Sequence, residues 1–153
     1  MTARVQTRVS AYAIAIEDER LLLTRLSEAS PIFTPGLWHL PGGGIDYGEQ
    51  PVEGLARELH EETGLELLDA RLLDVRSYAV PRHEVNWHLV ALFYAVDLKA
   101  GPPAVTEVDG STDATRWIPL SELQDSALSP AAADGLRLLD GPAPGSERHP
   151  ITG

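Results

Sequence analysis

Residues 43–65 read GGIDYGEQPVEGLARELHEETGL, and they contain a helix with clear start and stop signals. Pro51 suits the first position of a helix, where its missing N–H costs nothing, and Gly64 suits the position just past the end. Between them, apolar or small side chains recur at helical spacing: Val52, Leu55, Ala56, Leu59 and Thr63. We therefore predict a helix between Pro51 and Gly64 with one buried face.

The same helix carries three carboxylates beside its predicted buried face. At about 100° per residue, Glu58, Glu61 and Glu62 share an arc of roughly 100° in its second half. Like charges three and four residues apart destabilise a helix, and the macrodipole disfavours negative charge near the C-terminus. Such a conflict is typical of functional sites, where a bound cation would relieve it. Magnesium and manganese prefer these hard oxygen ligands, whereas the alternative is an ordinary solvated charged face.

The wider pattern around this helix resembles a known motif. Gly43 is followed after five residues by Glu49, and after seven more by the block RELHEETGL at residues 57–65. This spacing resembles the Nudix box at every fixed position. The preceding WHLPGG at residues 38–43 also resembles the entry strand of the Nudix hydrolase family. Outside residues 38–65 the chain resembles the family only in the order of its elements.

The resemblance implies a fold and a metal site. The expected fold is α/β or α+β, with a Nudix-like mixed β-sheet sandwiched between helices. Glu58 and Glu62 would be the principal ligands of Mg²⁺ or Mn²⁺, and Glu61 would bind a further ion or hold a water molecule. The Gly42 carbonyl would complete the shell.

Two further roles follow from the resemblance. Arg57 would pair with a glutamate of the box, Glu49, and orient it, which is a good use of a planar guanidinium beside carboxylates. The general base stays open between Glu61 and three acids of a distant loop, namely Glu107, Asp109 and Asp113. The alternative for the loop acids is a solvated turn, since Asp and Gly favour turns.

The implied chemistry is water attack on one phosphorus of a diphosphate, because bound metal ions neutralise phosphate charge and activate water. The expected substrate is a small nucleoside diphosphate derivative, a nucleoside triphosphate or ADP-ribose. Pro81 lies near where ADP-ribose-cleaving relatives carry a proline, but it also suits a strand or turn. Many of those relatives carry an N-terminal extension, whereas the first strand is predicted here at about residue 9. Specificity is expected from residues 26–37, 78–88 and 99–114.

Four alternatives compete with this function. One is a non-catalytic nucleotide-sensing module on the same fold, which need not keep its metal carboxylates. Another is a hydrolase of a non-nucleotide diphosphate, and a third is a structural acidic domain with no site. An isomerase acting on an isoprenoid diphosphate is disfavoured because that chemistry uses a catalytic cysteine, and the chain has none.

The chain on either side of the motif contains further predicted strands and one more helix. Strands are predicted at residues 9–16, 21–25, 38–40, 71–80 and 87–98. The three glycines at residues 42–44 are expected to break regular structure, and residues 99–114 to form a loop. Trp117 to Pro119 should return to the core, followed by a helical turn at residues 120–123. Ser129 should cap a final helix from Pro130 to about Leu139.

Composition limits the class of protein. The 153 residues fit one domain, expected at residues 1–140, with a loose tail at 141–153. The net charge of −11 disfavours a nucleic-acid partner. No apolar run could span a bilayer, no signal peptide is visible and there is no disulfide framework, so a cytoplasmic location is expected. The expected partner is a small diphosphate, and a homodimer is compatible with the sequence.

Overall fold

The computed structural model describes residues 4–105 and 110–139, and they form a mixed α/β fold. The strands are β1 (Arg4–Ile14), β2 (Ile16–Glu17), β3 (Arg20–Leu26), β4 (Trp38–His39), β5 (Gly42–Gly44), β6 (Leu67–Arg82), β7 (Val85–Leu98) and β8 (Thr112–Pro119). The helices are α1 (Pro51–Thr63) and α2 (Pro130–Leu138), with short 3₁₀ turns at Leu120–Glu122 and Asp125–Ala127.

The strands form two sheets. The larger sheet has the order β5-β1-β7-β6, in which β1 and β7 run parallel from Arg4↔Val85 to Ile14↔Ala95 and the other pairs are antiparallel. In the second sheet, β3 is the central strand and pairs with β2, β4 and β8. The first sheet is therefore mixed, as the sequence predicts.

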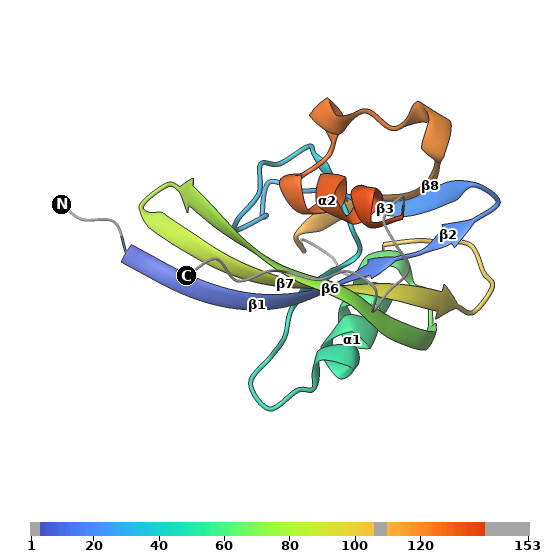
Figure 1. Cartoon of the computed structure of the whole chain (residues 1–153), viewed down its shortest axis with the longest axis horizontal. Helices are drawn as coiled ribbons and strands as arrows, with labels where there is room; N and C mark the ends of the chain where they lie inside the picture. The colour runs from blue at the N-terminus through green and yellow to red at the C-terminus, as the bar shows by residue number, and fades with distance from the viewer. Residues whose placement is uncertain (1–3, 106–109, 140–153) are drawn as a thin grey trace, which may run out of the picture.

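The two helices lie on opposite sides of the sheets (Figure 1). Strand β1 faces both sides because successive side chains alternate. Ala11 and Ala13 of β1 pack in one cluster with Leu55 and Leu59 of α1. Tyr12 and Ile14 of β1 pack in the other cluster with the alanines of α2. The predicted sandwich is thus confirmed, and it places α1 directly beside the β1–β5 pair.

The glycine run at residues 42–44 departs from the prediction. It forms strand β5 and pairs with β1 in the register Ser10↔Gly44, Ala11↔Gly43 and Tyr12↔Gly42, rather than breaking regular structure. A Cβ on Gly42 would lie 2.0 Å from the Ala11 carbonyl oxygen, and Gly42 has a φ of 139°. The absence of a side chain therefore permits this close backbone approach.

Other boundaries also differ. Strand β1 starts at Arg4 rather than near residue 9, because its pairing with β7 continues to that residue. Strand β8 begins at Thr112, inside the predicted loop, because it pairs along β3. The helical pattern predicts that Val52 is buried, but it is 42% exposed, since the buried residues of α1 begin at Gly54.

The final helix follows its prediction closely. The Ser129 hydroxyl accepts a hydrogen bond from the Ala132 N–H at 3.1 Å, and Pro130 takes the first helical position. The predicted tail at residues 141–153 lies outside the described residues. No helix in the described ranges is long and apolar enough to cross a membrane.

Candidate functional site

Helix α1 presents the acidic residues from a firmly bounded segment. At its start, the Gln50 N–H donates to the Glu53 carboxylate at 3.0 Å. At its end, Gly64 adopts a left-handed φ of 72°, and its N–H donates to the His60 carbonyl at 2.8 Å. Both ends satisfy backbone groups that a helix terminus would otherwise leave without partners.

Strand β5 supplies backbone polar groups to the same place. The Ala13 N–H of β1 donates to the Pro41 carbonyl, and the Ile45 N–H donates to the Val9 carbonyl of β1. Backbone polar groups along an antiparallel strand point alternately toward and away from the partner strand, so those of Gly42 and Gly44 point away from β1. The Gly42 N–H donates to Glu62 Oε1 at 2.9 Å, and the Gly44 carbonyl accepts from Arg57 Nη2 at 3.0 Å. The glycine strand and the acidic helix are therefore joined by direct hydrogen bonds.

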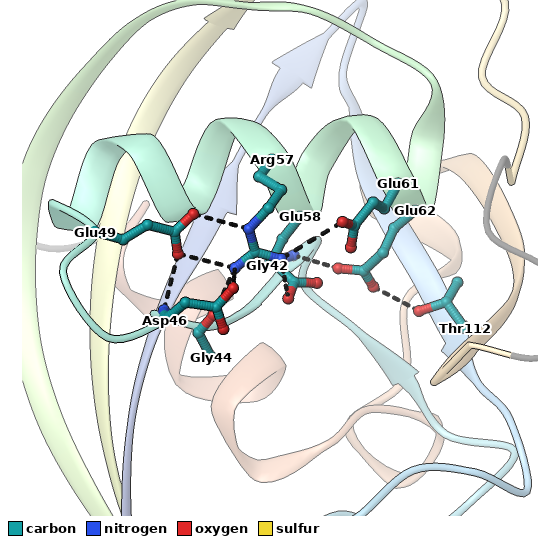
Figure 2. Close-up of polar contacts among 9 residues, drawn as sticks. All are labelled: Gly42, Gly44, Asp46, Glu49, Arg57, Glu58, Glu61, Glu62 and Thr112. Atoms are coloured by element: carbon teal, nitrogen blue, oxygen red, sulfur yellow. Dashed lines mark hydrogen bonds and ion pairs between the residues drawn. The ribbon is translucent and has the colours of Figure 1, made fainter.

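Glu62 is held at the centre of this junction. It is only 3% exposed, and its second carboxylate oxygen accepts a hydrogen bond from the Thr112 hydroxyl of β8 at 2.5 Å. Each oxygen thus has a donor, which is what a buried carboxylate requires. Figure 2 shows Glu62 between Gly42 and Thr112.

Arg57 organises the other acids through one guanidinium (Figure 2). Its Nε and Nη2 donate to the two oxygens of Glu49 at 2.8 and 2.9 Å, a bidentate pair. Its Nη1 donates to Glu58 at 3.0 Å and lies 3.5 Å from Glu61. Asp46 is a further partner at 3.3 Å. The predicted pairing of Arg57 with Glu49 is present in the structure.

These contacts shift the pKa values of the participating groups. The hydrogen bonds from Arg57 lower the pKa of Glu49 to about 2, and Glu49 in turn raises the pKa of Arg57 above its usual range. Burial raises the pKa of Glu58, even though Arg57 acts in the opposite direction. Glu58 is therefore a carboxylate whose negative charge is costly where it lies, and a cation would stabilise that charge.

The donor set fits a hard divalent cation, although its members are engaged with the chain's own donors. Within residues 4–105 and 110–139, no three His, Asp or Glu side chains form a ready-made metal-binding group. The carboxylate of Glu58 nevertheless lies against Gly43, where a Cβ would approach its carbon to 2.8 Å. Glycine at this position thus leaves room for a carboxylate against the strand, and carboxylate and carbonyl oxygens are ligands that Mg²⁺ prefers.

The candidates for the general base are separated by the structure. Asp113 accepts a hydrogen bond from Arg25 Nε at 2.7 Å, at a point where the register between β3 and β8 shifts. Glu107 and Asp109 lie outside the described residues. Glu61 remains on the edge of α1 beside Arg57.

Two cavities adjoin the junction or the loop beside it. The smaller, of about 50 Å³, is bounded by the glycine strand, Glu62, β1 and the 30–33 loop. Its walls include Arg8, Ser10, Tyr12, Phe33 and His39. The larger, of about 690 Å³, shares Ile32 and Phe33 with it and includes Pro81 and Arg82 in its wall.

His39 is fixed in the wall of the smaller cavity. Its Nδ1 shares a hydrogen bond of 2.5 Å with the Ser129 hydroxyl, which also accepts from the Ala132 N–H. Burial lowers the pKa of His39 to about 3, and Tyr12 contacts its ring edge-on at 4.7 Å. The sequence alone assigns no role to this residue.

Several residues of the junction are missed by sequence reasoning. Thr112 lies 50 positions from its partner Glu62, and a threonine in an expected loop gives no signal. Arg8 lies on β1 and reaches over Gly44, where a Cβ would come within 2.6 Å of its guanidinium nitrogens. Only the alternation of β1 on the face shared by Ser10 and Tyr12 could have suggested it.

Comparisons with known proteins agree with this geometry. A family model described as the NUDIX domain matches residues 6–139. The chain is 34% identical over 112 residues to an RNA pyrophosphohydrolase from Rhizobium meliloti, a match covering 62% of this chain and 66% of the relative. It is 29% identical over 139 residues to a MutT-like protein from Streptomyces ambofaciens, covering 91% and 80% of the two chains.

The similar solved structures also include NUDIX hydrolases. A MutT NUDIX hydrolase from Burkholderia pseudomallei superposes with a TM-score of 0.74 at 32% identity, covering 88% of this chain and 98% of that one. The chain spans just under two thirds of the length of the Rhizobium meliloti relative.

Proposed function

Because the chain belongs to the NUDIX domain family, we propose that it is a pyrophosphohydrolase that uses a divalent cation to cleave a diphosphate linkage in a nucleoside diphosphate derivative. The observation that carries this proposal is the junction of the glycine strand with the acidic edge of α1. Gly42 and Gly44 direct backbone groups at Glu62 and Arg57, so main chain and carboxylates face one space.

The ligands follow from this arrangement. Glu58 and Glu62 would hold Mg²⁺ or Mn²⁺, Glu61 would bind a further ion or hold a water molecule, and the Gly42 carbonyl would complete the shell. When bound, the metal ion would neutralise phosphate charge and lower the pKa of a bound water molecule. Glu62 is already oriented by Gly42 and Thr112, so it would reach the ion from a fixed position.

Arg57 and Glu49 act as positioning residues. Arg57 spans Glu49, Glu58 and the Gly44 carbonyl, so it fixes the distance between the strand and the helix. Glu49 itself accepts from the Asp46 N–H at 2.8 Å, which ties the loop before α1 to the same guanidinium. Geometry held in this way supplies positioning, which phosphoryl-transfer chemistry chiefly requires of a protein.

Glu61 is the proposed general base. It lies on the same helical edge as Glu58 and within 3.5 Å of Arg57, so it shares the space where water would attack. Asp113, the described alternative, is engaged in an ion pair with Arg25 at 2.7 Å.

The proposed substrates are a nucleoside triphosphate and ADP-ribose. A relative named RNA pyrophosphohydrolase adds a 5′-triphosphate RNA end as a comparison substrate, although a net charge of −11 disfavours a long polyanion. Pro81 borders the larger cavity, whose volume of about 690 Å³ is within the range of small-ligand sites.

Product analysis with the full chain tests the proposal. Each substrate is incubated with Mg²⁺, with Mn²⁺ and with chelator, and products are separated. Pyrophosphate and a monophosphate from a nucleoside triphosphate, or AMP and ribose 5-phosphate from ADP-ribose, would support nucleotide hydrolysis. Cleavage of only a non-nucleotide diphosphate would overturn the nucleotide part. Binding without turnover of any diphosphate would indicate the sensing module instead.

A further inference from the structure

Among residues 4–105 and 110–139, the Arg8 guanidinium has no acidic partner within ion-pair distance. Its side chain is half-buried on β1, and among the same residues the guanidinium makes no hydrogen bond. Arg57, by contrast, is surrounded by Glu49, Glu58 and Asp46. Within the described part of the chain, Arg57 is thus engaged with carboxylates, whereas the donors of Arg8 are not.

The surrounding backbone is shaped around the Arg8 side chain. A Cβ on Gly44 would lie 2.6 Å from Nε and 2.6 Å from Nη2 of Arg8, so only glycine lets the guanidinium lie on this strand. The positive charge of Arg8 also acts on Glu58 of the acidic helix. Burial raises the pKa of Glu58, and the attraction to Arg8 is one of the effects that lower it. Arg8 is thus next to the strand that joins the acidic helix.

The positive charge of Arg8 lies in a protein that is otherwise strongly negative. The chain carries a net charge of −11, so a phosphate entering the junction meets a repulsive field. The smaller cavity contains Glu62 and, among the described residues in its wall, Arg8 is the one Arg or Lys. Arginine is well matched to phosphate oxygens because its planar fork donates two parallel hydrogen bonds.

The size of the cavity limits what lies beside Arg8. Its volume is about 50 Å³, whereas a cavity of about 150 Å³ accommodates benzene. The small volume favours a compact phosphate group over a nucleobase as the occupant. The larger cavity across Ile32 and Phe33 has room for the nucleoside.

We propose that Arg8 and the wall of the smaller cavity form the binding site for a terminal, unesterified phosphate of the substrate. This inference rests on the proposed diphosphate chemistry for the identity of the ligand. It selects nucleoside polyphosphates, which end in a free phosphate, over ADP-ribose, in which both phosphates are esterified. Arg8 binds the phosphate that the metal ligands do not hold and takes no part in activating water.

Calorimetric titration of the full chain with inorganic pyrophosphate and Mg²⁺ tests the site without requiring turnover. Arg8→Gln should weaken pyrophosphate binding at least about tenfold, and Arg8→Lys should recover part of the loss, because charge is restored without the fork. Arg4→Gln, on the exposed start of the same strand, is the matched control and should bind as wild type. Equal affinities of wild type and Arg8→Gln, or no binding by wild type, would overturn the proposal.

Kinetics separate this site from the proposed function. With a nucleoside triphosphate, Arg8→Gln should raise KM at least about tenfold with a smaller change in kcat, since a ground-state phosphate contact is lost. Wild type should also prefer the triphosphate to ADP-ribose by at least about tenfold in kcat/KM. An equal or reversed preference would overturn the terminal-phosphate assignment while leaving hydrolysis intact. A chain that cleaves no diphosphate would refute the hydrolase and still leave the pyrophosphate titration decisive for Arg8.

Discussion

The Gly42 N–H donates to Glu62 Oε1 at 2.9 Å, and this hydrogen bond joins strand β5 to helix α1 across 20 positions of the chain. It orients a buried carboxylate without using a second side chain. The Thr112 hydroxyl donates to the other oxygen, so both carboxylate oxygens of Glu62 are held by the fold. The geometry of the junction therefore depends on Glu62 as a hydrogen-bond acceptor as well as on its charge.

Glu62→Gln separates those two properties. The amide oxygen can still accept from Gly42, and the amide N–H can donate to Thr112, so the fold should be kept. Loss of the charge removes a hard anionic ligand, and turnover should fall at least about a hundredfold. Thermal melting of the metal-free variant and steady-state assay of the same preparation check this. An unfolded variant, or a normal rate, would contradict the assignment of Glu62 as a ligand.

Divalent cations should raise the melting temperature of wild type, because a ligand that binds only the folded state stabilises it. The comparison is Glu58→Gln/Glu62→Gln, whose shift with Mg²⁺ or Mn²⁺ should be much smaller. Without metal, the double variant should be as stable as wild type or slightly more so, since repulsion between i and i+4 acids is relieved. Equal shifts in the two proteins would place the ion elsewhere.

His39 gives the fold a defined acid sensitivity. Its pKa is lowered from 6.5 to about 3 by burial, so between these values the unfolded chain binds a proton that the folded chain does not. Stability from this group is therefore full above about pH 6.5 and falls with decreasing pH toward 3, by at most about 1.4 kcal/mol per pH unit.

Denaturant titrations at several pH values measure this slope. His39→Asn keeps a hydrogen-bond partner for the Ser129 hydroxyl but cannot titrate, so its stability should depend less steeply on pH in that window. His88→Asn changes an exposed histidine of β7 and should keep the wild-type slope. If the unfolding free energies of wild type and His39→Asn change with pH in parallel, burial of His39 is not the cause of the acid sensitivity.

What the sequence predicts well is local. The caps of α1 and α2, the period of Leu55 and Leu59, and the acidic edge all arise from residues a few positions apart. The Arg57–Glu49 pair is also short-range, at eight positions. Such features are determined by helix geometry and capping, so they can be predicted without knowledge of the tertiary fold.

What the sequence does not predict depends on distant contacts. Thr112 reaches Glu62 across 50 positions, and Ser129 reaches His39 across 90, so neither pairing follows from spacing. The glycine run forms a strand only because β1 lies close enough to pair with it. Arg8 gains its position from Gly44 on the neighbouring strand rather than from any sequence neighbour.

Gly43→Ala tests the metal ligand Glu58 through the backbone beside it. The added Cβ would lie 2.8 Å from Cδ, 2.9 Å from Oε2 and 3.1 Å from Oε1 of Glu58. These are the far atoms of a flexible side chain, and Gly43 has no positive φ, so alanine should be accommodated by displacing the carboxylate. The metal-free melting temperature should stay within about 3 °C of wild type.

The same displacement should cost the protein its cation. Because Glu58 no longer lies against the strand, the Mg²⁺-induced rise in melting temperature should be mostly lost, and turnover should fall with it. Gly42→Ala is the contrasting variant. Its Cβ would meet the Ala11 carbonyl oxygen at 2.0 Å on a backbone with φ of 139°, so it should lower the metal-free melting temperature by at least about 5 °C. A Gly43→Ala protein that keeps the full Mg²⁺ shift would show that Glu58 does not hold the ion.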